Sequence, residues 1–192
     1  MTKARKTELR VPTADQIEQL LRSFSTAPTS VRNRALCGLL WRCGLRISEA
    51  LALTMGDLDR ARGRLVVRCG KGSKSRTVGL DAGAMALVDA WLAMRPAGGR
   101  VLFVTLAGKT VSASYCRSML IRKGAKIGLP GLHPHALRHA FAAGLVREGH
   151  SMPTVQKSLG HSSLATTATY LASLGEDEAA EAVASRSWML PV

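Results

Sequence analysis

Residues 159–170 read Leu-Gly-His-Ser-Ser-Leu-Ala-Thr-Thr-Ala-Thr-Tyr, and this stretch decides how the rest of the chain is interpreted. Its tyrosine follows its histidine by nine residues. Upstream, residues 135–138 read His-Ala-Leu-Arg, residues 70–74 read Gly-Lys-Gly-Ser-Lys, and residues 44–49 read Gly-Leu-Arg-Ile-Ser-Glu. No single motif is decisive, but together they supply a nucleophile and a set of groups suited to a phosphate.

Attack on a phosphodiester needs a nucleophile, positive hydrogen-bond donors for the phosphoryl oxygens, and an acid for the leaving oxygen. Tyr170 fits the first need. A free phenol has a pKa of about 10, so only ~0.1% is ionised at pH 7, and a neighbouring cation or histidine must favour the phenolate or remove the proton. The competing interpretation is an ordinary aromatic residue. The other tyrosine, Tyr115, lacks such surroundings.

Two arginines fit the second need, because a guanidinium is planar, always charged, and offers paired donors to two phosphate oxygens. Arg46 follows a helix-ending glycine, and Arg138 lies three residues after His135, on the same helical face. Arg46 also has a structural interpretation as an intrahelical ion pair with Glu49 at i, i+3. Both can hold, in which case Glu49 orients Arg46.

The remaining polar residues of the motifs have competing interpretations. Lys71, between two glycines, could protonate the leaving 5′-oxygen or simply contact a phosphate. His161 could donate to a phosphate oxygen or could be a capping or core histidine. His133 and His139 are interpreted as incidental polar residues, and a zinc site made with His135 lacks a second ligand cluster.

Positive charge is concentrated in the chain rather than scattered. The 192 residues carry a formal net charge of +14, and no Asp or Glu occurs between Asp89 and Glu148 or from Arg60 to Leu80. Solubility charge is the alternative, but clustering of this kind predicts a polyanionic partner, with nucleic acid favoured. We expect DNA contacts from basic residues of these runs, namely Lys74, Arg76, Arg117, Arg122 and Lys123.

Several other classes of protein are disfavoured. The four cysteines form no C-x-x-C or metal-ligand spacing, so we expect reduced thiols in a cytoplasmic protein. No signal peptide and no run of 18 apolar residues is present, which predicts no membrane span. We expect no small-molecule substrate.

The local patterns predict an α+β fold that is mainly α, with helices around a small antiparallel β-sheet. Two strands should flank the glycine-rich segment 70–73 as a hairpin. Helices are predicted at about 13–24, 30–43, 46–53, 81–95, 112–127, 135–148, 153–159, 164–171 and 177–187.

In these motifs the chain resembles the tyrosine recombinase (phage integrase) family, from about Val11 to about Leu174. The resemblance implies the catalytic-domain fold of that family. It implies a DNA strand-transferase that cuts and rejoins DNA through a 3′-phosphotyrosyl intermediate, without metal, ATP or another cofactor. The partners implied are double-stranded DNA and three further protomers, giving a homotetramer on recombining DNA. The catalytic set implied is Arg46, Lys71, His135, Arg138, His161 and the nucleophile Tyr170.

Two rival functions remain: a type IB topoisomerase-like activity, and a non-catalytic DNA-binding regulator with the same fold. The sequence departs from the family at its front, where most members carry an additional helical domain. Residues 1–10 are interpreted as a basic arm or linker remnant before a catalytic domain at 11–174, which leaves open an excised domain or a short natural member. The tail at 175–192 either docks on a neighbouring protomer or packs on its own core.

Overall fold

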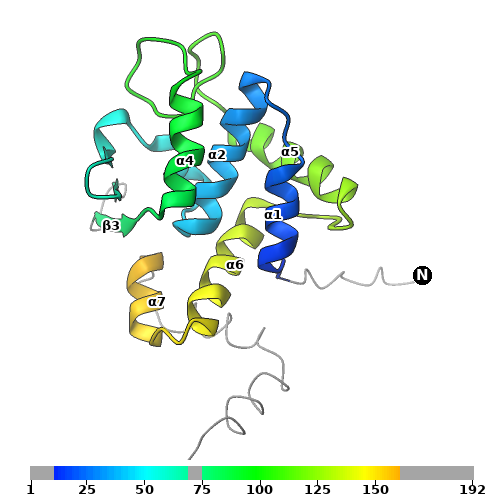
Figure 1. Cartoon of the computed structure of the whole chain (residues 1–192), viewed down its shortest axis with the longest axis vertical. Coiled ribbons are helices and arrows are strands. Elements are labelled where there is room, and N and C mark those ends of the chain that lie inside the picture. Colours follow the sequence, from blue (N-terminus) through cyan, green and yellow to red (C-terminus); the bar gives the residue numbers. More distant parts are fainter. Residues whose placement is uncertain (1–10, 69–74, 161–192) are drawn as a thin grey trace, which may run out of the picture.

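The computed structural model describes residues 11–68 and 75–160, and within them helices make up most of the fold, with a small sheet at one edge of the helical part (Figure 1). This confirms the mainly α fold class. The elements, in chain order, are α1 (Ala14–Arg22), α2 (Pro28–Arg42), α3 (Ile47–Ala52), the 3-10 turn η1 (Met55–Asp57), β1 (Leu58–Asp59), β2 (Arg64–Val67), β3 (Arg76–Gly79), α4 (Ala82–Leu92), α5 (Ala113–Lys126), α6 (Pro134–Arg147) and α7 (Met152–Leu159).

Side-chain caps begin several helices where the sequence predicts them. At α1, Thr13 Oγ1 accepts a hydrogen bond from the backbone of Gln16, and the Gln16 side chain accepts one from Thr13 N. This reciprocal pair satisfies two backbone donors that the first helical turn leaves open. Asp81 starts α4 in a related way, accepting from Ala84 N at 2.8 Å. The predicted helices at 164–171 and 177–187 lie outside the described residues.

The sheet has the strand order β1-β2-β3 with both pairings antiparallel. The hairpin strands β2 and β3 were predicted, whereas β1 and η1 were not, because two or three residues are too few to give a pattern. Leu65 and Val67 are buried on one face of β2, and Val78 of β3, the register partner of Leu65, is buried with them. The sheet therefore has an apolar face toward the helices.

Helix α2 lies at the centre of the helical part, with α4 along one side and α6 packed against it (Figure 1). Its central position explains why nearly every residue from Ala35 to Leu40 is fully buried. Cys37 and Cys43 are buried, unpaired thiols, and burial raises the pKa of Cys43 to about 12. No helix in the described residues is both long and apolar enough to cross a membrane.

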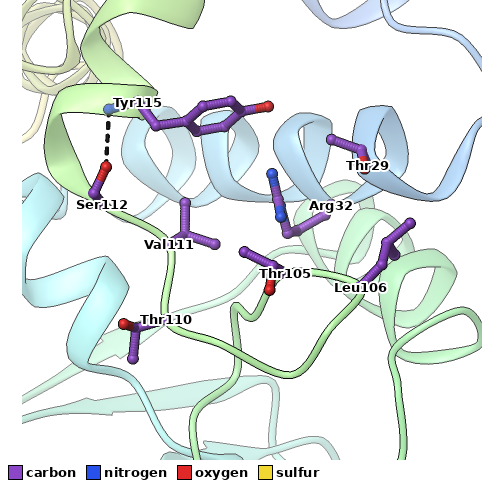
Figure 2. A pocket seen from close by; sticks show the side chains of 8 residues that line it. All are labelled: Thr29, Arg32, Thr105, Leu106, Thr110, Val111, Ser112 and Tyr115. Carbon is purple, nitrogen blue, oxygen red and sulfur yellow. Dashed lines mark hydrogen bonds between the residues drawn. The ribbon is translucent and has the colours of Figure 1, made fainter.

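A pocket of about 450 Å³ lies beside the first turns of α2 and α5 (Figure 2). Arg32, which lines this pocket, is buried, donates to the Val104 carbonyl and to Asn33 Oδ1, and lies over the Tyr115 ring. Asn33 Nδ2 donates to the Tyr115 hydroxyl at 2.9 Å. These contacts join α2 to α5 and to the irregular segment before it, and they give Tyr115 a structural role.

Candidate active site

The carboxylate of Glu49 lies at the centre of the group of charged residues that forms the candidate site. Residue 46 is the last extended residue before α3, and Glu49 is the third helical residue, where an acidic side chain folds back onto the backbone N–H of the cap position. Glu49 Oε2 accepts from Arg46 N at 2.8 Å. Gly44 allows the turn that precedes α3, because its φ is +58° and a Cβ there would overlap the Phe141 ring.

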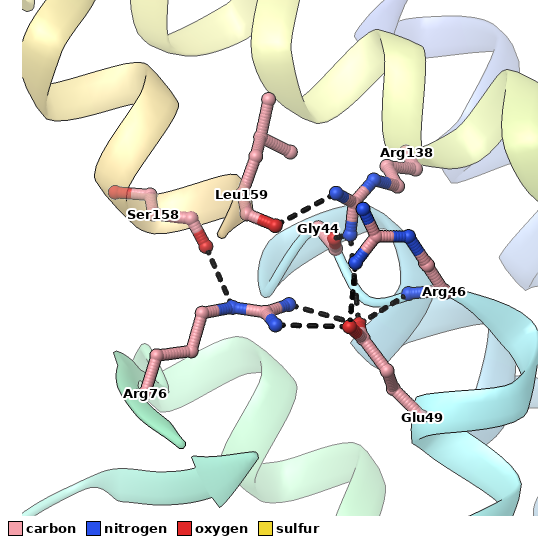
Figure 3. Close-up of polar contacts among 7 residues, drawn as sticks. All are labelled: Gly44, Arg46, Glu49, Arg76, Arg138, Ser158 and Leu159. Atoms are coloured by element: carbon pink, nitrogen blue, oxygen red, sulfur yellow. Dashed lines mark hydrogen bonds and ion pairs between the residues drawn. The ribbon is translucent and has the colours of Figure 1, made fainter. Parts of the chain in front are cut away.

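Three arginines from distant parts of the chain meet at this carboxylate (Figure 3). Arg46 Nη1 donates to Glu49 Oε1 at 2.9 Å. Arg76 on β3 donates through both terminal nitrogens, at 2.9 and 2.8 Å. Arg138 on α6 places Nη1 3.5 Å from Glu49 Oε2. We call Arg46, Glu49, Arg76 and Arg138 the Glu49 cluster. Within it three positive charges share one negative charge, which suits it to an anionic ligand.

Solvent access differs within the Glu49 cluster. The side chain of Arg46 is 40% exposed, whereas those of Glu49, Arg76 and Arg138 are 9%, 10% and 2% exposed. Burial alone would raise the pKa of Glu49, but the hydrogen bonds from Arg76 and Arg46 outweigh it and lower the pKa to about 2. The carboxylate is therefore ionised at any physiological pH, and Arg46 is the arginine of the cluster presented to solvent.

This shift predicts acid sensitivity. The folded-state pKa of about 2 lies below the ordinary value of 4.5, so ionised Glu49 stabilises the fold above pH 4.5, and that contribution is lost as the pH falls from 4.5 toward 2. The shift corresponds to about 3 kcal/mol. We expect the difference in unfolding free energy between the wild type and Glu49→Gln, measured by urea denaturation, to shrink steadily across this window. A constant difference would contradict the ion pairs.

Arg138 connects the site to two backbone segments. Its Nη1 donates to the carbonyl of Gly44, at the end of α2, and its Nη2 donates to that of Leu159, at the end of α7, the latter at 2.7 Å. Both carbonyls belong to helix ends, where no intrahelical donor remains for them. Arg138 thus fixes the turn that leads to Arg46 and the last turn of α7, which directly precedes His161 in the sequence.

His135 stands at the start of α6, one helical turn before Arg138. With Ile47, Arg117 and His133 it lines a pocket of about 300 Å³. Burial lowers the pKa of His135, and the positive charges of Arg138, Arg46 and Arg117 lower it further. A neutral imidazole beside three arginines can accept a proton or a hydrogen bond at neutral pH.

The neighbouring histidines have other surroundings. His133 caps α6, since its Nδ1 accepts from Ala136 N at 3.2 Å. Burial lowers the pKa of His139, and the charges of the nearby histidines and of Arg138 lower it further. In the described part of the chain no three His, Cys, Asp or Glu side chains come together in a way that could hold a metal ion.

The remaining predicted residues fall into two groups. Lys71, Lys74, His161 and Tyr170 lie outside the described residues. On α5, Arg117 and Arg122 are exposed, whereas Lys123 Nζ donates to the Ser23 carbonyl at 2.6 Å and lies over the Phe24 ring. The sequence thus predicts three similar basic residues on α5, and the structure places one of them against the end of α1.

Arg76 is the residue whose surroundings the sequence analysis missed. The DNA contact that the sequence predicts for Arg76 stays a prediction, and the structure adds that its guanidinium lies inside the site, paired with Glu49. A signal for this was present in the sequence, because side chains two apart on a strand share a face. Val78, two residues later, is an apolar residue of the core face, so Arg76 had to point the same way.

Comparison with known proteins identifies relatives along most of the chain. The model of the phage integrase family matches residues 10–176. The chain is 39% identical over 175 residues to tyrosine recombinase XerC of Actinobacillus pleuropneumoniae serotype 7, covering 88% of this chain and 57% of the relative. It is 36% identical over 179 residues to XerC of Alcanivorax borkumensis, covering 88% and 58%. The chain thus spans less than two thirds of the length of these curated relatives.

Solved structures agree with this result. The crystal structure of XerA recombinase superposes with a TM-score of 0.81 at 27% identity, covering 92% of this chain and 65% of that one. XerH site-specific recombinase, in a post-cleavage complex with palindromic difH substrate, superposes with a TM-score of 0.77 at 28% identity, covering 96% and 55%. The resemblance inferred from the sequence motifs is confirmed, and the chain belongs to the phage integrase family.

Proposed function

We propose that this chain is the catalytic part of a site-specific DNA recombinase, and that it cuts and rejoins DNA through a 3′-phosphotyrosyl intermediate. The observation that carries the proposal is the Glu49 cluster. It brings Arg46 and Arg138, 92 positions apart in the chain, to the same carboxylate, and it leaves an excess of positive charge where a phosphate could be held. The names of the XerC relatives and the post-cleavage complex of XerH support the same function.

In the proposed reaction, Tyr170 Oη forms a bond to the scissile phosphorus and the bond from phosphorus to the 5′-oxygen breaks. The phenol proton passes to the neutral imidazole of His135, and the leaving 5′-oxygen takes a proton from Lys71. Arg46, Arg138 and His161 stabilise the extra negative charge of the pentacoordinate transition state. A 5′-hydroxyl of a partner strand then reverses these steps, so the energy of the broken bond is kept in the phosphotyrosyl ester.

We further propose that four protomers assemble on recombining DNA in the cytoplasm, with residues 175–192 as the element that docks on a neighbour. The alternatives are a type IB topoisomerase-like enzyme and a non-catalytic DNA-binding regulator. A regulator would have no use for a cluster that holds three arginines on one carboxylate beside a neutral histidine. The similarity to XerC and XerH recombinases favours a recombinase over a topoisomerase.

The experiment that tests this function is covalent trapping. The protein is incubated with a library of nicked duplexes and denatured in detergent, and the DNA that remains attached is sequenced. We expect adducts that share a sequence motif. Adducts without a motif would favour a topoisomerase, and binding without adducts would favour a regulator.

DNA binding should depend steeply on salt. Each phosphate neutralised contributes about 0.9 to the slope of log affinity against log salt concentration. We expect Arg117→Gln and Arg122→Gln each to reduce this slope by about that amount, because both side chains are exposed on α5. Lys123→Gln should change it less, because Lys123 Nζ is bound to Ser23. Fluorescence anisotropy between about 50 and 200 mM salt measures the slope, and a flat profile for the wild type would exclude duplex DNA as the main partner.

A further inference from the structure

Arg76 lies on the inner face of strand β3. Its register partner on β2 is Val67, which is buried, and Val78 two residues later is buried too. An arginine on the apolar face of a sheet is costly unless its charge is paired and its donors are bound. The surroundings of Arg76 meet both conditions, as its 10% exposure and its ion pair with Glu49 indicate.

The guanidinium of Arg76 joins three elements. Both terminal nitrogens donate to the two oxygens of Glu49, at 2.9 and 2.8 Å, in the parallel geometry that only arginine offers. Nε donates to the Ser158 carbonyl at 3.1 Å (Figure 3). One planar group therefore connects β3, the start of α3 through Glu49, and the last turn of α7.

Gly160 allows the side chain of Arg76 to approach the end of α7 closely. It ends α7 in the left-handed conformation, with φ of +64°, and a Cβ built there would lie 2.9 Å from both Cδ and Nη1 of Arg76. Arg76 cannot retreat without losing Glu49 or Ser158, so a side chain at position 160 would displace it. The end of α7 is thus fitted to the guanidinium.

We infer that Arg76 is a positioning residue, which holds the hairpin strand and the end of α7 against Glu49 and, through Glu49, fixes Arg46 and Arg138. This inference rests on the proposed function for what the positioned groups do. It fits the sequence, in which Lys71 precedes Arg76 by five residues and His161 follows Gly160 directly. The role differs from the phosphate contact that the sequence alone predicts for Arg76.

Kinetics separates the two roles. Arg76→Gln removes the positive charge and the paired N–H donors of the guanidinium but keeps part of the aliphatic side chain. Arg64→Gln is the matched control, since Arg64 is exposed on the neighbouring strand β2. The substrate is a DNA site recovered by covalent trapping. We expect Arg76→Gln to lower the single-turnover cleavage rate at saturating DNA about 10- to 100-fold, because small displacements of catalytic groups reduce the rate by that much. Affinity and its salt slope should stay unchanged.

The inference is overturned if Arg76→Gln reduces the salt slope by about 0.9 while cleavage at saturation is unaffected, since this is the behaviour of a phosphate contact. Arg76→Lys is a second variant for the case in which Arg76→Gln does not fold. It keeps the positive charge beside Glu49, but a lysine side chain cannot bind Glu49 and the Ser158 carbonyl at the same time. We expect a lowered cleavage rate for this variant as well, and wild-type cleavage would overturn the inference.

A second measurement needs no activity. In Arg76→Gln, amide hydrogen exchange in peptides of α7 should become at least about threefold faster, because α7 loses its hydrogen bond from Arg76. Exchange in peptides of α4, which Arg76 does not hold in place, should be unchanged. If the wild type forms no DNA adduct, the proposed function fails, yet this exchange pattern still decides whether Arg76 tethers α7. Unchanged exchange in α7 would overturn the tether.

Discussion

Replacing Glu49 by glutamine should destabilise the protein by roughly 3–5 kcal/mol, the range for removing one partner of a buried ion pair. The side chain of Glu49 is 9% exposed and accepts from Arg46 and Arg76, with Arg138 3.5 Å away. Glutamine keeps the shape but leaves three guanidinium groups without a negative charge among them, and its amide nitrogen faces other donors. Urea denaturation at pH 7 measures the loss.

The control for this prediction is Glu18→Gln. Glu18 also pairs with an arginine, Arg22, at 2.6 Å, but its side chain is 46% exposed. Exposed pairs of this kind contribute at most about 1 kcal/mol. If Glu49→Gln costs no more than Glu18→Gln, then the Glu49 cluster does not hold the site together, and the account of Arg76 fails with it.

Arg46 and Arg138, the two arginines that we propose to be catalytic, should respond differently to alanine. We expect Arg46→Ala to lower the single-turnover cleavage rate by about 10²–10³, as the loss of one transition-state donor does, while stability falls by less than about 1 kcal/mol. Its side chain is 40% exposed, and the backbone N–H of residue 46 still donates to Glu49 Oε2. Cleavage and denaturation are measured on the same preparation.

Arg138→Ala should lose cleavage to a similar extent and also stability, by roughly 3–5 kcal/mol. Arg138 is 2% exposed, and its removal leaves the carbonyls of Gly44 and Leu159 without its hydrogen bonds. DNA affinity should fall much less than the cleavage rate for both variants, because their donors matter most in the transition state. Equal losses of affinity and rate would instead indicate plain phosphate contacts.

What could be predicted from the sequence was mostly local. The helix starts at Thr13 and Asp81 follow from capping chemistry, and the pairing of Arg46 with Glu49 follows from a spacing of three residues on one helix. The same local patterns predict the mainly α fold class. These features depend on residues that are near one another in the chain, so their patterns are visible without the structure.

The missed features depend on contacts between distant segments. Nothing near Arg138 in the sequence indicates that its donors go to the backbone of residues 44 and 159. Lys123 and Arg122 are neighbours of the same charge, yet only Lys123 meets the end of α1. Arg76 was the exception, because strand alternation with Val78 placed it inside, and the general basic character of the segment concealed that signal.

Mapping the covalent attachment shows whether Tyr170 is the nucleophile. After trapping on nicked duplex DNA, the adduct is digested with nuclease and protease, and mass spectrometry locates the nucleotide-bearing peptide. The chain has two tyrosines, and Tyr115 is held in place by Asn33. We predict attachment at Tyr170 and no adduct with Tyr170→Phe, although this variant should bind DNA like the wild type. Attachment at Tyr115, or adducts that persist in Tyr170→Phe, would contradict the account.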